Sequence, residues 1–292
     1  MLLSRPITSS AIALTLLTPA GLRAQGSAAA SLDAFVEQVR VATRRYHDQS
    51  VAFSDGYRRM GPDVPSMGQH WIALPRITSE RADPRQPPIL EYARINGQLT
   101  LIGVGYALRL AEGVELDPMT VPAPASAWRY VHGTLSEDGL ILNHADSVTE
   151  PIVAVPRLAV LHAWVWQPNP AGVFATDNWS LPYVRLGLQP PAQPRPGPTT
   201  LALALAAGGE QYFHTLLRMR YRPRPSEALR TGGILARYAR SLHASVVVEK
   251  ADSAMIADQW QALDNDLRAA CPSCSREGGP ILGFQTGSGA LP

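Results

Sequence analysis

Apolar residues recur at three- and four-residue steps near the start of the chain and again after residue 199. Between Ser31 and about Arg59 this period predicts an amphipathic helix, with Ser31 as its N-cap. After residue 199 the same period predicts an all-helical region, whose segments are Thr200 to Ala207, Glu210 to Tyr221, Glu227 to about Val248, and Asp252 to Ala270.

The middle of the chain has the pattern of strands. The apolar runs from Ile89 to Tyr92 and from Leu99 to Leu110 flank Asn96-Gly97, a pair preferred in tight primed turns, and they predict a β-hairpin. Gly103 and Gly105 fall on one face of the second run, which indicates a bulge or the close approach of another backbone.

These patterns predict an α+β fold, in which an N-terminal helix packs on a mostly antiparallel β-domain and an all-α C-terminal region follows. The Pro-rich stretch 189–198 is typical of a stiff linker. The expected organisation is a signal peptide at 1–24, an α+β domain with histidine and tryptophan motifs at 26–188, the linker at 189–198, helices at 199–270, and a Cys-x-x-Cys unit with a flexible tail at 271–292.

Composition narrows the function classes. The 292 residues are 46% hydrophobic and 17% charged, which argues against a chain that is disordered throughout. Because 26 Lys and Arg stand against 24 Asp and Glu, the chain lacks the basic surplus of a dedicated nucleic-acid binder. No apolar stretch reaches the roughly 18 residues that a transmembrane segment needs.

Residues 1–24 have the features of a secretory signal peptide. Arg5 precedes an apolar stretch from Ala11 to Leu17, and small residues lead to a predicted cleavage site near Ala24. We therefore expect a secreted or periplasmic protein. In such a compartment Cys271 and Cys274 favour a local disulfide over a redox-active pair or half of a metal site, although the sequence leaves all three open.

Two segments combine histidine with tryptophan. His70 and Trp71 follow a turn, and a strand from Arg157 to Trp166 would place His162 on the same face as Trp164 and Trp166. A buried imidazole nitrogen needs a partner, which is either a hydrogen-bond acceptor, as in most structural histidines, or a metal ion.

The supply of histidines before the linker favours the metal interpretation. Neutral imidazole is a common ligand of zinc and copper, and either ion would suit an exported protein. No pair has the spacing of a helical His-Glu-x-x-His site, so a site would be assembled from distant segments. The expected ligands are His70 and His162, then His132, with Glu91 as a weaker fourth; Glu91 and Asp177 are the carboxylates expected nearby.

Three motifs of the chain are Met67-Gly68-x-His70-Trp71, Pro87-x-x-Leu90-x-Tyr92 with Leu101-x-Gly103-Val104-x-Tyr106, and Leu161-His162-Ala163-Trp164-x-Trp166-x-x-Asn169-Pro170-x-Gly172-x-Phe174. They resemble motifs of a family of secreted bacterial proteins of unknown function, over roughly residues 45–188. The long third motif is the specific one, and the chain departs from the family at Pro88, where Glu is usual, and at Asn178-Trp179, where Asn-Pro is usual. The resemblance implies that His70 and His162 share one exported domain, and it implies no reaction.

The leading hypothesis is an exported protein with a histidine-lined polar site that binds a transition metal, zinc or copper. A second hypothesis is a non-enzymatic binding or structural module, in which the tryptophans form a core or a ligand platform. A third, a metal-assisted hydrolase, requires a water-exposed Glu or Asp beside the metal. No catalytic residue and no oligomeric state is predicted; the expected ligand-contacting residues are Trp71, Glu91, Trp164, Trp166 and Asn169.

Overall fold

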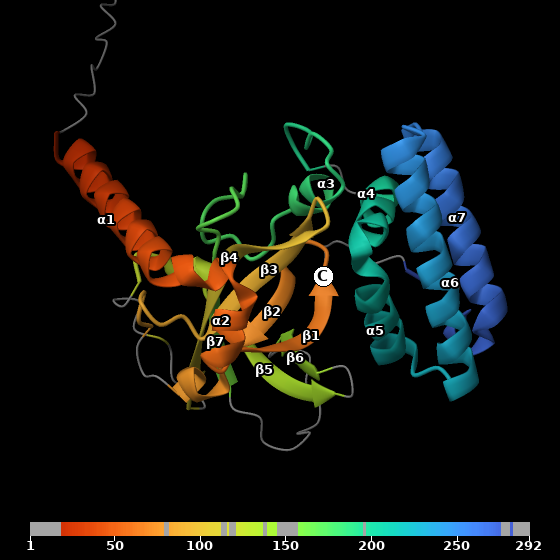
Figure 1. The fold of residues 1–292 in the computed structure, drawn as a ribbon, viewed down its shortest axis with the longest axis horizontal. Coiled ribbons are helices and arrows are strands. Elements are labelled where there is room, and N and C mark those ends of the chain that lie inside the picture. Colours follow the sequence, from red (N-terminus) through yellow and green to blue (C-terminus); the bar gives the residue numbers. More distant parts are fainter. Residues whose placement is uncertain are drawn as a thin grey trace, which may run out of the picture.

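A computed structural model describes residues 19–78, 82–111, 116, 121–136, 139–144, 157–194, 197–275 and 281–282. It confirms the α+β class, because one antiparallel sheet lies between an N-terminal helix and a C-terminal group of helices (Figure 1). The strand order is β1-β2-β3-β4-β7-β5-β6. The strands are β1 (Arg58–Val64), β2 (Gly68–Ile72), β3 (Ile89–Ile95), β4 (Gln98–Leu110), β5 (Arg129–Ser136), β6 (Gly139–His144) and β7 (Arg157–Ala163).

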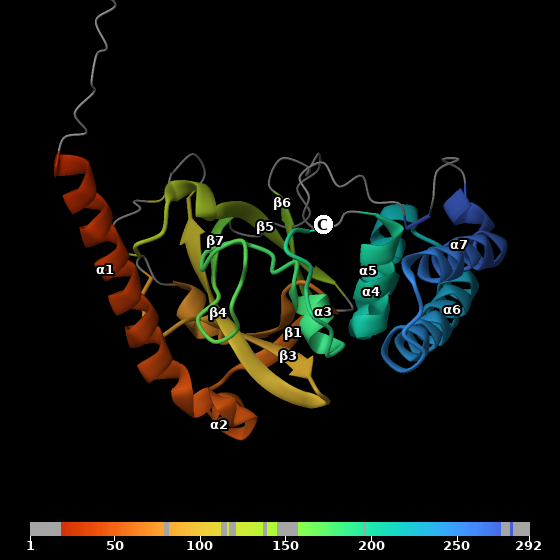
Figure 2. The same cartoon turned by 90° about the horizontal axis from the view of Figure 1, so that it is seen from above.

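Helix α1 lies at one end of the molecule and helices α4 to α7 at the other, with α2 and α3 beside the sheet (Figure 1). Figure 2 shows α1 on one side of the sheet and the C-terminal helices on the other, with α4 and α5 next to the sheet and α6 and α7 outside them. The helices are α1 (Pro19–Thr43), α2 (Gln49–Ser54), α3 (Leu181–Arg185), α4 (Pro198–Ala204), α5 (Glu210–Tyr221), α6 (Pro225–His243) and α7 (Ser253–Ala270). The four helical segments expected after residue 199 are thus confirmed.

The predicted hairpin is present as β3 and β4. Asn96 and Gly97 form its turn with φ angles of 51° and 78°, and the pairing starts at Ile95 opposite Gln98. Positive φ at both central residues is the geometry that made this pair a turn signal.

The single helix expected from Ser31 to Arg59 is wrong. α1 ends at Thr43, and α2 starts only after Asp48, whose side chain accepts a hydrogen bond from the backbone of Ser50. Gly56 then turns with φ of 90°, and Arg58 already belongs to β1. A side-chain cap and a left-handed glycine therefore interrupt an apolar pattern that itself continues.

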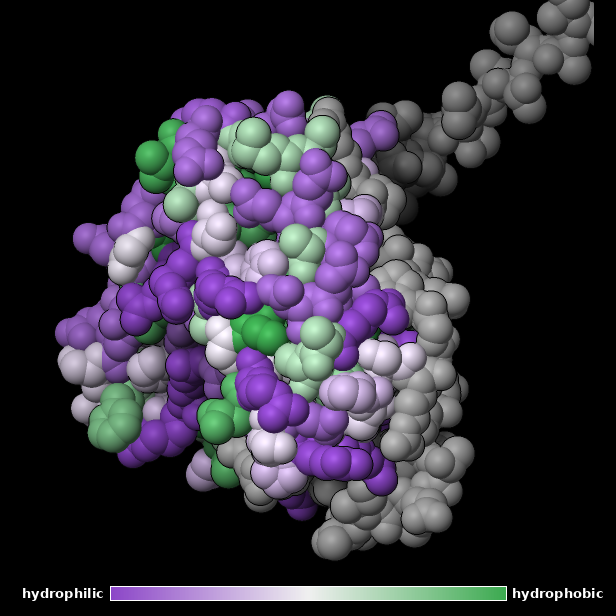
Figure 3. All heavy atoms as spheres, turned by 90° about the vertical axis from the view of Figure 1, so that its right-hand side faces the viewer, coloured by the Kyte–Doolittle hydropathy of each residue, from purple (hydrophilic) through white to green (hydrophobic). Residues whose placement is uncertain are grey.

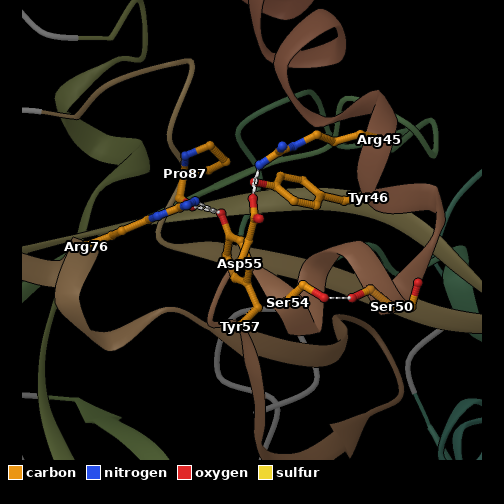
Figure 4. Close-up of polar contacts among 8 residues, drawn as sticks. All are labelled: Arg45, Tyr46, Ser50, Ser54, Asp55, Tyr57, Arg76 and Pro87. Atoms are coloured by element: carbon orange, nitrogen blue, oxygen red, sulfur yellow. Dashed lines mark hydrogen bonds and ion pairs between the residues drawn. The ribbon is translucent and has the colours of Figure 1, made fainter.

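A polar network holds this interrupted segment together (Figure 4). The Tyr46 hydroxyl donates to the Asp55 carboxylate at 2.8 Å, and Arg45 forms an ion pair with the same carboxylate. The Tyr57 hydroxyl donates to the carbonyl of Pro87 at 2.5 Å, which ties the start of β1 to the loop before β3.

Two hydrophobic clusters cover opposite faces of the sheet. Phe35 and Val39 of α1 pack against Tyr92, Tyr106 and Leu161 on one face. A smaller cluster on the other face includes Ile72, Ile89, Ala107, Leu158 and Val160. The second cluster adjoins the histidine site described below, because Ile72 and Ile89 are two residues from His70 and Glu91 along their strands.

The C-terminal helices have a core of their own, to which Leu205, Phe213, Leu235, Trp260 and Leu263 contribute. On their outer face hydrophilic side chains separate the apolar ones (Figure 3). The part of the chain that the structure describes contains no helix with the length and apolarity to cross a bilayer.

The predicted signal peptide, linker boundary and C-terminal tail remain predictions. Residues 1–18 lie outside the described part of the chain, and α1 runs through the predicted cleavage site near Ala24. The linker boundary at 189–198 and the tail after residue 282 are likewise untested, although α4 already begins at Pro198.

The expected local disulfide joins Cys271 and Cys274, and both cysteines are buried. Burial keeps reagents from the sulfur atoms, so the bond is placed as a structural clip rather than as an exchanging pair. Next to it, Ser273 donates to Glu227 at 2.9 Å, which links the end of α7 to the first turn of α6.

Reducing the disulfide of the wild-type chain should lower its free energy of unfolding by about 2 kcal/mol, because the bond closes only a very short loop. Urea denaturation of the oxidised and reduced protein measures the difference. The Cys271→Ala/Cys274→Ala variant should not change further on reduction. A loss above about 4 kcal/mol would contradict a clip that acts mainly on the unfolded chain.

Candidate metal centre

Strand register brings three titratable side chains to one face of the sheet. His70 of β2 lies opposite Glu91 of β3, and Glu91 lies opposite Gly103 of β4. Two residues further along β4, Gly105 lies opposite His162 of β7. Directly opposed residues point to the same face, and so do residues two apart, so all three side chains project from one side.

Two glycines of β4 allow the side chains of Glu91 and His162 to approach each other. Glu91 and His162 come from strands that are two apart, with backbones separated by about 10 Å, so side chains on the strand between them would keep them apart. A Cβ atom on Gly103 would lie 2.8 Å from Glu91 Oε2 and 2.9 Å from the carbonyl oxygen of Ala163. The expected close approach of another backbone is confirmed at Gly103, whereas a Cβ atom on Gly105 would meet the side chains of Ile89 and Glu91. The expected bulge appears as a register shift between Glu91 and Tyr92.

The three side chains converge. His162 Nδ1 lies 3.4 Å from Glu91 Oε1, and the rings of His70 and His162 have their centroids 5.6 Å apart at 63°. One ligand atom from each of the three residues lies within 4.8 Å of the others, so the group could hold a metal ion. Tetrahedral zinc ligands are about 3.4 Å apart, so His162 and Glu91 fit as they stand, and the pairs that involve His70 lie within 4.8 Å.

The polar atoms of this cluster lack ordinary partners. Glu91 is 0% exposed and His162 6%, and among the described residues neither Glu91 oxygen nor His162 Nδ1 has a hydrogen-bond partner. An unpaired buried polar group costs roughly 1–3 kcal/mol, so three on one point are costly. A metal ion at that point would satisfy all three atoms.

Burial determines the protonation of the cluster. It raises the pKa of Glu91 well above its ordinary value, and it lowers the pKa of His70 to about 4. Burial also lowers the pKa of His162 to about 3, with further lowering from the charges of His70 and Arg129. Without a metal, burial therefore favours the neutral form of all three groups, and neutral imidazole has a lone pair available to a cation.

The second nitrogen of His162 has a partner that orients the ring. The backbone of Thr176 forms a hydrogen bond with His162 that favours the protonated ring. Among the described residues Nδ1 has no hydrogen-bond partner, so Nε2–H is the group that would donate to the Thr176 carbonyl, which would leave the Nδ1 lone pair facing Glu91. A backbone carbonyl behind a histidine is the usual support of a metal ligand.

The tryptophans do not line the cluster. β7 ends at Ala163, and the backbone N–H of Trp164 donates to Val173, so the alternation expected through Trp166 is wrong. Trp164 is buried with Ile102 and Leu181, and its Nε1 donates to the carbonyl of Ala175. A single platform of Trp164 and Trp166 is therefore not formed.

The other two predicted tryptophans, Trp166 and Trp71, also lie away from the site. Trp166 donates to Thr43 and its ring lies against His47, with centroids 4.5 Å apart. Trp71 neighbours His70 in the strand and therefore points to the opposite face, where its ring packs on Tyr92.

The remaining predicted residues lie elsewhere. β5 pairs His132 with Arg157, five residues before His162 along β7, so their backbones are about 16 Å apart, and the His132 side chain lies outside the described part. Asn169 donates to the carbonyl of Asp177 and accepts from Ala171, which makes it a loop-forming residue.

Comparison of the chain with protein-family profiles, with curated proteins and with solved structures finds no match. The resemblance of its motifs to a secreted family stays a prediction, and the function is inferred from the site alone.

Gly103→Ala should destabilise the protein by about 1–3 kcal/mol, because the new methyl group would overlap Glu91 and the β7 backbone. Gly233→Ala is the matched control, since nothing lies within 4 Å of its added Cβ and it sits inside α6. That control should gain about 0.5–1 kcal/mol. Thermal and urea unfolding compare the two; equal effects would contradict the close packing over β4.

In the metal-free protein, the free energy of unfolding of Glu91→Gln should increase relative to that of the wild-type chain as pH rises. The folded pKa of Glu91 is raised, so the wild-type chain loses stability from about pH 4.5 upward, at about 1.4 kcal/mol per pH unit until the folded pKa is passed. The lowered histidine pKa values reduce stability as pH falls below about 6.5, but equally in both proteins.

Urea unfolding of both proteins in EDTA, from pH 4.5 to pH 8, measures this difference. The advantage of Glu91→Gln should be smallest at pH 4.5 and should grow with pH. A difference that stays constant with pH would mean that Glu91 does not titrate abnormally in the folded chain.

Proposed function

We propose that this is an exported protein that binds one transition-metal ion through His70, His162 and Glu91. The observation that carries the proposal is the convergence of His70, Glu91 and His162 on one point of the sheet, where neither Glu91 oxygen nor His162 Nδ1 has a hydrogen-bond partner among the described residues. A site of hydrogen-bonded structural histidines would have paired those atoms.

The donor set favours zinc or copper. Two imidazole nitrogens and one carboxylate oxygen suit Zn²⁺, and imidazole with oxygen also suits Cu²⁺. Three protein ligands leave a coordination position for water or a solute. His70 keeps some accessible surface, so that position would be reached from its side.

The proposal does not extend to catalysis. A metal-assisted hydrolase needs a carboxylate that is exposed to water beside the metal, and Glu91 is fully buried. Asp63 is close enough to raise the pKa of His70, but Arg185 and Gln69 hold both of its oxygens. Neither residue provides a free general base.

Export is part of the proposal. The predicted signal peptide at 1–24 supports it, and so does the disulfide between Cys271 and Cys274, since such bonds persist mainly in oxidising compartments. Metal acquisition would then follow export.

Protein purified from the exported fraction should contain about one equivalent of zinc or copper, measured by elemental analysis. His70→Ala/His162→Ala should lose nearly all of it. His47→Ala/His214→Ala removes the same number of imidazoles outside the cluster and should retain it, since His47 lies against Trp166 and His214 bonds the Ala228 carbonyl.

Cobalt provides a second readout that does not depend on the metal present at purification. Co²⁺ added to metal-free protein should give the visible absorption of a four-coordinate site, and Glu91→Gln should weaken its binding at least tenfold, because the amide lacks the ligand charge. Equal metal content in the two double variants, together with no cobalt spectrum, would refute the proposal.

A further inference from the structure

A second polar site lies where the sheet meets the C-terminal helices. A partly open cavity of about 420 Å³ lies between β1 and the β3–β4 turn on one side, and α5 with the segment Leu205–Gly209 before it on the other. This volume is within the range of small-molecule sites, about 300–1,000 Å³. Its charged lining residues are Arg59, Arg94, Arg185, Asp63 and Glu210, and His243 also lines it.

The charges of this cavity leave an excess of guanidinium groups. Asp63 is neutralised by Arg185 through two bonds of 2.7 and 3.0 Å. Arg59 donates only to the Gln211 amide oxygen and Arg94 only to the Gly97 carbonyl, so in the described part of the chain neither has a carboxylate partner. These two arginines therefore face one carboxylate, that of the exposed Glu210.

The Arg185 side chain lacks one hydrogen-bond acceptor among the described residues. Its side chain is 3% exposed, and its Nε has no hydrogen-bond partner among the described residues. The backbone fits closely over this group, because Gly208 turns with φ of 95° and a Cβ there would lie 3.1 Å from an Arg185 terminal nitrogen. A guanidinium held in place by Asp63 and short of one acceptor is preorganised for an oxyanion.

We infer that this cavity binds a small solute with a carboxylate or phosphate group. Arg59 and Arg94 supply the charge, and an oxygen of the solute supplies the acceptor that Arg185 lacks. The lining residues come from the sheet part and from the helical part, so a bound solute stabilises the contact between them.

The cavity is lined by none of the three residues of the metal centre. Gln69 lines the cavity, whereas its neighbour His70 points to the opposite face of β2. Loss of the metal ligands should therefore leave solute binding intact.

Calorimetric titration of the full chain with inorganic phosphate and with succinate, in 150 mM NaCl, tests the inference. At least one probe should bind saturably, and Arg59→Gln/Arg94→Gln should weaken that binding at least tenfold. Arg94 is exposed, so the single Arg94→Gln variant should keep the fold and still bind several-fold more weakly. Binding of phosphate alone, succinate alone or both identifies the group that the site prefers.

The matched control is Arg109→Gln/Arg240→Gln, which removes two exposed arginines outside the cavity and should change the affinity less than twofold. His70→Ala/His162→Ala should bind as tightly as the wild-type chain. Saturable binding of neither probe, equal weakening in both arginine pairs, or loss of binding in the histidine variant would each overturn the inference.

Discussion

The burial of the Glu91 carboxyl group, which has no hydrogen-bond partner among the described residues, is the constraint on which this side of the sheet depends. A carboxyl group in such a place is costly unless a cation or donor meets it. β4 has glycine at positions 103 and 105, and the absence of side chains there allows the Glu91 carboxyl group to reach across to His162. The sheet thus loses packing at two central positions, and the space is occupied by one polar cluster.

The loop after β7 serves this cluster indirectly. Trp164 donates to Ala175, and the buried Asn178 donates to the carbonyl of Pro168, so both ends of the loop are bonded across it. The loop carries Thr176, whose backbone forms a hydrogen bond that favours the protonated ring of His162. Trp164 and Asn169 of the long histidine and tryptophan motif therefore hold the loop that carries Thr176, and His162 is the motif residue that belongs to the polar cluster.

The Asp63–Arg185 pair lies between the two proposed sites. Its carboxylate raises the pKa of His70, while its guanidinium lines the cavity beside the helices. Because Asp63 is bonded by both Arg185 and Gln69, it is an ordered charge at the boundary of the two parts of the chain. A change in this pair would alter the electrostatic potential at both sites.

The sequence by itself determined the elements whose signals are local: the hairpin around Asn96-Gly97, the four C-terminal helices, and the pair of histidines that one site would need. It did not place the end of β7, because the bond from Trp164 to Val173 that stops the strand joins residues across a loop. From the sequence, Glu91 was a weaker candidate metal ligand than His132. Only strand register puts Glu91 opposite His70 and places the two glycines of β4 next to it. Periodicity reports which face a residue occupies, whereas the tertiary structure decides which faces of distant strands coincide.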